Sequence, residues 1–156
     1  MKTVLFFALA CFLFSAVILG AEDVRSSTGL GFHAGYLSSS GYSMRFFKDG
    51  AGIQGTIGAY ATKKESAFNL GINGIVVLDE FNKGRFYVIG GGSIRNYSNK
   101  TVVGEEHNRW TLGAGLGLEW ILAKNLRVSL ELPITWNWKD EIIMWIPMGG
   151  LYYYLK

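Results

Sequence analysis

The stretch RWTLGAGLGLEW, residues 109–120, determines how the rest of the sequence is interpreted. Apolar side chains occupy every second position: Trp110, Leu112, Ala114, Leu116, Leu118 and Trp120. Side chains that alternate with a period of two lie on opposite faces of a β-strand. The second face carries Thr111, Glu119 and three glycines, where a soluble sandwich would present larger polar residues to water. This strand therefore has an apolar face bounded by tryptophans and an unusually small opposite face.

The first 21 residues are expected to be a cleaved signal peptide. Lys2 supplies a positive charge, residues 4–19 form an uncharged apolar run, and the small residues at 20 and 21 suit a cleavage site. Two alternatives remain open: an uncleaved anchor helix, for which the run is short, and a lipoprotein, which would need cleavage at Cys11 after a very short apolar core. We assign residues 1–21 to the signal peptide and residues 22–156 to one exported domain.

The composition of the exported domain limits its class. Cys11 is the single cysteine, so residues 22–156 cannot form a disulfide. The chain has 21 glycines, 15% aromatic residues and only two prolines, which argues against a disordered or collagen-like protein. The whole chain has a net charge of +3 and its basic residues are scattered, so we expect no nucleic-acid partner. An exported chain rich in glycine and aromatics points to β structure.

The same alternation recurs along the exported domain and predicts eight strands. It is clear over residues 29–38 and 126–136, whereas in residues 85–97 Tyr87 and Ile89 oppose Phe86 and Val88, which leaves the faces ambiguous. Polar and glycine-containing segments predict connections at two ends of the domain. One end is expected to hold residues 48–50, 79–84 and 123–125, and the outer end residues 38–40, 62–66, 98–109 and 137–141.

Small residues on one face favour the crowded interior of a narrow closed barrel, with the apolar face toward lipid. Trp110 and Trp120 are ten residues apart. That is about 33 Å along a strand, and about 25 Å of bilayer height at a tilt of ~40°. Closure is required because lipid cannot satisfy an open sheet edge. We therefore predict an all-β, eight-stranded antiparallel up-and-down transmembrane β-barrel. The alternative is a soluble exported barrel with its glycine-rich face outside, which would bind a small apolar ligand.

The exported domain as a whole resembles a known group of proteins, and two segments carry the resemblance most clearly. Residues 41–61, GYSMRFFKDGAGIQGTIGAYA, and the ending GGLYYYL resemble eight-stranded outer-membrane barrels related to the transmembrane domain of outer membrane protein A and the small adhesin-like barrels of Gram-negative bacteria. The ending resembles a barrel-assembly signal through Gly149, Tyr152 and Tyr154, although Leu155 and Lys156 follow. The resemblance implies the outer membrane of a Gram-negative-type bacterium, contact with outer-membrane lipid, and recognition of the C-terminal strand by the barrel-assembly machinery.

Alternation also predicts which side chains fill the lumen. Four charged residues are expected to point inward and to form a salt-bridged plug, because an isolated charge in a narrow lumen is costly. These are Arg45, Glu119, Arg127 and Glu131. A gated, weakly conducting channel is the alternative role of the same charges. Aromatic residues at the membrane boundaries form an expected girdle. Its members are Trp110, Trp120, Trp136, Tyr152 and Tyr154.

The sequence shows no catalytic constellation, and we expect no enzyme activity, cofactor or metal. Barrel enzymes that act on lipid A pair a histidine with a serine, but His33 and His107 stand in HAG and HNR. A metal site at residues 105–107 is the alternative to a solvated loop. We predict a non-enzymatic outer-membrane barrel with a filled lumen and a structural or surface-interaction role through its outer loops, toward an unknown surface ligand. A narrow pore and an enzyme acting on outer-leaflet lipid are the alternatives.

Overall fold

The computed structural model describes residues 26–62, 64–99, 106–138 and 142–155. Its strands pair antiparallel in a single sheet. No helix in this described part is long and apolar enough to span a membrane. The strands are β1 (Ser26–Ala34), β2 (Gly41–Lys48), β3 (Ala51–Ala61), β4 (Glu65–Phe81), β5 (Gly84–Asn99), β6 (Glu106–Ile121), β7 (Leu126–Asn137), β8 (Ile142–Trp145) and β9 (Met148–Leu155). The predicted signal peptide, residues 1–21, lies outside the described residues and stays a prediction.

The sheet closes on itself to form a barrel. β1 pairs with β2 on one side and with β9 on the other, and β7 joins β6 to β9. β8 and β9 pair with β7 in one continuous register, so they are two halves of the eighth strand. The break falls at Pro147, which has no N–H to donate to a ladder. The predicted eight-stranded antiparallel barrel is confirmed, with its last strand interrupted.

The apolar faces of the strands point outward. Phe32 and Ile134 are 58% and 62% exposed, whereas Gln54 and Thr135 on the alternating positions are fully buried. A soluble barrel has the opposite arrangement, with its apolar side chains inside. The glycine-rich face of β6 lies inside, since Thr111 and Glu119 of that face are buried. The soluble alternative with this face outside is therefore wrong.

Glycine lines the interior of β6 because the neighbouring groups leave no room for a side chain. A Cβ at Gly117 would lie 2.2 Å from the Tyr87 ring. At Gly115 it would lie 2.3 Å from the Cα of Pro133 on β7. Tyr87 and Ile89 are both fully buried, so these bulky residues of β5 occupy the space that the glycines of β6 leave free. This packing also assigns the ambiguous faces of β5: Tyr87 and Ile89 point inward.

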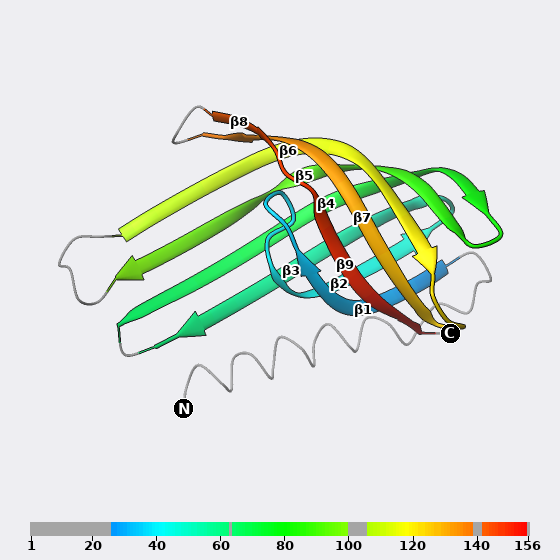
Figure 1. Ribbon diagram of the computed structural model, residues 1–156, viewed down its shortest axis with the longest axis horizontal. Helices are drawn as coiled ribbons and strands as arrows, with labels where there is room; N and C mark the ends of the chain where they lie inside the picture. The colour runs from blue at the N-terminus through cyan, green and yellow to red at the C-terminus, as the bar shows by residue number, and fades with distance from the viewer. Residues whose placement is uncertain (1–25, 63, 100–105, 139–141, 156) are drawn as a thin grey trace.

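The barrel is much taller on one side. β4, β5 and β6 contain 17, 16 and 16 residues, whereas β1 and β2 contain 9 and 8. Figure 1 shows these three strands continuing well beyond the connection between β1 and β2, at the end opposite the last residues of β9. The loops predicted at 62–66 and 98–109 are therefore too long, because β4 begins at Glu65, β5 reaches Asn99 and β6 begins at Glu106. Backbone pairing continues there through polar residues, which side-chain alternation does not reveal.

Candidate functional site

Arg45 on β2 is the centre of a charge cluster in the lumen. The charge cluster consists of three arginines and two glutamates: Arg45, Arg85, Glu119, Arg127 and Glu131. Arg45 is fully buried; its Nη1 lies 2.9 Å from Glu119 Oε2, and its Nη2 contacts Glu131 Oε1. Its Nε donates over 2.8 Å to Gln54, the residue directly opposite on β3. One guanidinium thus links the β2–β3 wall to carboxylates on β6 and β7.

Glu119 on β6 is bonded by two further arginines. Arg85 stands directly opposite on β5, and its Nη2 lies 2.6 Å from Glu119 Oε1. Arg127 Nη1 lies 3.2 Å from the same oxygen. The Tyr154 hydroxyl donates to Oε2 over 2.9 Å. A buried carboxylate is costly unless it is paired and hydrogen-bonded, and here both oxygens of Glu119 have partners.

Glu131 on β7 joins the charge cluster to a chain of polar side chains. The Tyr87 hydroxyl donates to Glu131 Oε1 over 2.7 Å. Glu131 Oε2 lies 3.6 Å from His33 Nε2. The Tyr152 hydroxyl lies 3.0 Å from His33 Nδ1 and 3.1 Å from Ser43 Oγ. His33 is therefore an interior residue between Glu131 and Tyr152.

Aromatic rings cover the guanidinium groups and fill the remaining lumen. A guanidinium over a ring face gains cation–π attraction, which is strongest where water is excluded. The distances from guanidinium carbon to ring centroid are 4.1 Å for Arg45 over Tyr152, 3.6 Å for Arg85 over Phe47 and 4.5 Å for Arg127 over Tyr154. Chemically, this arrangement can brace the wall and block passage. No group of three or more metal-binding side chains occurs in the part of the chain that the structure describes.

The structure brings together the four charged residues that the sequence placed in the lumen. Arg45 contacts both glutamates, and Arg127 reaches only Glu119, from the edge of the cluster. Arg85 and the tyrosine partners were not predicted from the sequence. Arg85 and Tyr87 are two residues apart on β5 and therefore point to the same face. Assigning Tyr87 to the lumen would also have assigned Arg85 to it. The side chains at 105–107, where a metal site was an alternative, lie outside the described residues.

The predicted girdle is partly wrong. Trp110 and Trp136 point outward and are 55% and 39% exposed, and Trp120 is half-buried at the other end of β6. Tyr152 and Tyr154 instead point inward and are buried. On β9 the outward positions are Leu151, Tyr153 and Leu155. The reason is the register with β1 and β7, which directs the Tyr152 and Tyr154 hydroxyls to partners in the lumen.

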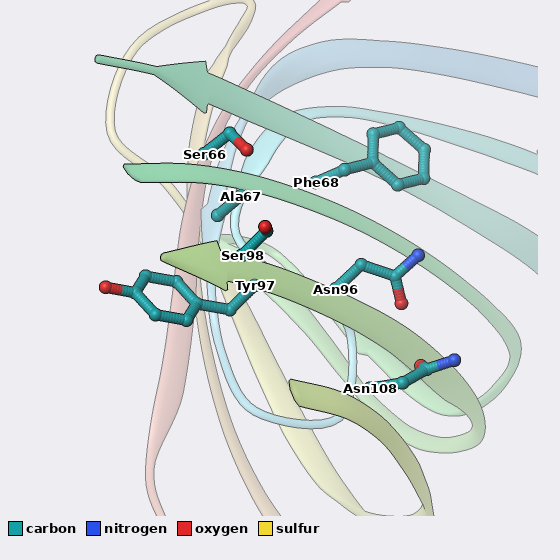
Figure 2. Close-up of a pocket in the computed structure, with 7 residues that line it drawn as sticks. All are labelled: Ser66, Ala67, Phe68, Asn96, Tyr97, Ser98 and Asn108. Atoms are coloured by element: carbon teal, nitrogen blue, oxygen red, sulfur yellow. The ribbon is translucent and has the colours of Figure 1, made fainter. Parts of the chain in front are cut away.

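A second candidate site is a shallow hollow of about 380 Å³ near the ends of β4, β5 and β6 that extend beyond the connection between β1 and β2. Figure 2 shows Phe68, Asn96 and Asn108 pointing to one side of the sheet and Tyr97 to the other. Asn96 lies opposite both Phe68 and Asn108 in the ladder. The Tyr97 hydroxyl donates to Glu65 over 2.6 Å, which braces the other side. On the outward face of this part of the wall, Phe68 therefore lies in one row with two asparagines.

Comparison with known proteins identifies the fold. No protein-family model matches the chain, and no curated protein sequence does. Among solved structures, the N-terminal β-barrel domain of Pseudomonas aeruginosa OprF superposes with a TM-score of 0.63 at 17% identity, over 84% of this chain and 98% of that domain. The chain has the fold of that barrel.

Two further structures are less similar. Ail, the attachment invasion locus protein of Yersinia pestis, has a TM-score of 0.49 at 16% identity, over 83% of this chain and 97% of Ail. Neisserial surface protein A has a TM-score of 0.47 at 12% identity, over 83% of this chain and 91% of its own.

Proposed function

We propose that this chain is a non-enzymatic integral outer-membrane protein. In this proposal the charge cluster closes its lumen, and the outer ends of β4–β6 form a surface for interaction. The fold shared with the OprF barrel and the outward apolar faces support the membrane location. Outer-membrane lipid would contact those faces, and the barrel-assembly machinery would receive the C-terminal strand. A surface ligand is proposed only as a class, a partner of the extracellular side.

The position of the bilayer follows from the outward side chains of β5 and β6. Trp110 lies opposite Ile94, and the next outward pair above them is Asn96 and Asn108. Tryptophan marks the membrane boundary in outer-membrane barrels, and asparagine belongs in water. We therefore place the outer boundary at Trp110 and the hollow of Figure 2 above it. The projecting ends of β4–β6 then face the exterior, which supports a surface-interaction role.

The observation that most directly supports a closed lumen is the complete burial of Arg45, Glu119 and Glu131. An open aqueous pore would leave such charges solvated, whereas here each one is bonded to protein groups. The narrow pore is the second candidate function. It would open if the ion pairs of the same charge cluster exchanged partners. His33 is buried beside Tyr152 and Glu131, and this burial supports the absence of lipid-directed catalysis.

Conductance in planar lipid bilayers tests the closed lumen. The refolded chain beginning at Glu22 is expected to insert without channel openings. Steady openings from the unmodified protein would overturn the closed lumen and establish the narrow pore. Mass analysis of lipid A from cells that produce the protein tests the enzyme alternative, and an unchanged acyl pattern is expected.

A further inference from the structure

The connection between β1 and β2 is folded into the barrel. This connection, residues 35–40, is called the strap below. A loop that links two strands at the rim normally lies on the surface. In the strap, however, Leu37, Ser38 and Ser39 are all fully buried. The sequence predicts only a short outer loop at residues 38–40. The burial of residues 37–39 shows instead that the strap enters the lumen.

The strap crosses the lumen, because its main contacts are with β5. In an eight-stranded ring β5 lies opposite β1, from which the strap begins. Arg95 on β5 donates from Nη2 to the Tyr36 carbonyl over 3.2 Å and also to the Gly35 carbonyl. The Ser93 hydroxyl donates to the same Tyr36 carbonyl over 3.0 Å. The Arg95 guanidinium carbon lies 4.4 Å from the centre of the Tyr36 ring, and Arg109 Nη1 lies 3.3 Å from its hydroxyl.

The surrounding wall is shaped to receive the strap. A Cβ at Gly71 on β4 would lie 2.2 Å from the Ser38 carbonyl oxygen, so only glycine allows this approach. The Leu37 amide donates to the Met148 sulfur over 3.3 Å. Ser39 has a left-handed backbone with a φ of 66°, and Gly41 has a φ of 145°, which returns the chain to β2. The inward turn is therefore built into the backbone and into two walls of the barrel.

The strap is bound unevenly. Its Tyr36 end is held by charged hydrogen bonds from Arg95, which are the stronger kind. At the other end, the buried hydroxyls of Ser38 and Ser39 have no hydrogen-bond partner among the described residues. Burying a hydroxyl without a partner costs free energy. The hydrogen bonds that join the strap to the wall go to β5, β6 and β9, and none of those described reaches Arg45, Glu119 or Glu131.

We propose that the strap is an inward-folded closure of the outer mouth, held by Arg95 and separate from the charge cluster beneath it. This inference rests on the proposed closed lumen and adds a second barrier in series. Loss of Arg95 frees the strap to swing out as an ordinary outer loop, while the charge cluster stays intact and the barrel stays non-conducting. Release of the strap is therefore an accessibility change that conductance alone does not report.

Thiol labelling of the strap tests this proposal. The chain beginning at Glu22 contains no cysteine, so Ser38→Cys provides a single reporter. Refolded barrels in vesicles are treated with a membrane-impermeant maleimide. We expect Ser38→Cys to label slowly and Ser38→Cys with Arg95→Met to label roughly tenfold faster or more, because the open form becomes more populated. Arg127→Met is the matched control, since it removes an arginine of the charge cluster and leaves Arg95 in place.

Two controls keep the outcomes separate. Lys64→Cys, at an exposed position, should label rapidly in every background. Gly71→Ala provides a second release variant, because its Cβ would collide with the strap, and it should also accelerate labelling of Ser38→Cys. If Ser38→Cys labels at the same rate alone, with Arg95→Met and with Gly71→Ala, the proposal is overturned, whether that common rate is slow or fast. Channel openings from the unmodified protein would instead overturn the closed lumen.

Discussion

Glu131 is fully buried and takes hydrogen bonds from Arg45 and Tyr87. Glu131→Gln removes one of the two carboxylates that pair with Arg45, and breaking a buried pair leaves an uncompensated charge. We expect the free energy of unfolding to fall by on the order of 3 kcal/mol. Urea titration of tryptophan fluorescence in lipid vesicles measures it, with Glu80→Gln at the exposed end of β4 as the control. Equal midpoints for Glu131→Gln and the unmodified protein would contradict a bracing role of the charge cluster.

Gly117 shows how closely the lumen is packed, since a Cβ there would lie 2.2 Å from the Tyr87 ring. Gly117→Val should lower the free energy of unfolding by about 1–3 kcal/mol through overpacking. Gly55 on β3 faces outward with nothing within 4 Å of its would-be Cβ, so Gly55→Val should introduce no such strain. Both variants are compared by the same urea titration. A loss at Gly55 as large as that at Gly117 would remove the packing explanation.

Individual strands differ in how much their sequences predict. In β6 and β7 one face is apolar and the other small or charged, so alternation alone assigned Glu119, Arg127 and Glu131 to the lumen. β9 contains three consecutive tyrosines, which carry no alternation, and its faces are set by hydrogen bonds to β1 and β7. The strap depends on Arg95, some 60 residues away, a contact that no local pattern contains.

The apolar band of β6 between Trp110 and Trp120 should be intolerant of charge. Leu116 lies near the middle of that band and is exposed on the outward face. Leu116→Lys places a charge in hydrocarbon and should destabilise the barrel by about 2–4 kcal/mol. Leu122, which is 60% exposed in the turn after β6, is the control, and Leu122→Lys should cost far less. Equal effects in vesicle unfolding would show that the band does not lie in lipid.

The two ends of the whole molecule differ, and in the proposed orientation the taller end faces the exterior. Lys64 is exposed in the connection between β3 and β4, whereas Lys83 and Lys124 are exposed in turns at the opposite end. Trypsin added to intact Gram-negative cells that produce the protein should cut after Lys64 and spare the other two sites. Mass spectrometry of the fragments identifies the cuts. Cleavage after Lys83 or Lys124 in intact cells, with Lys64 spared, would reverse the orientation.

In the proposed membrane state, the apolar surface of the closed barrel faces lipid and its core is the polar lumen. Closure leaves no open sheet edge, and together with the charge cluster it accounts for stability without a disulfide. The most direct measurement is gel mobility of the detergent-refolded chain in SDS, boiled against unboiled. We expect the unboiled barrel to resist SDS and to migrate differently from the boiled chain. Identical mobility, from protein that stays soluble without detergent, would contradict it.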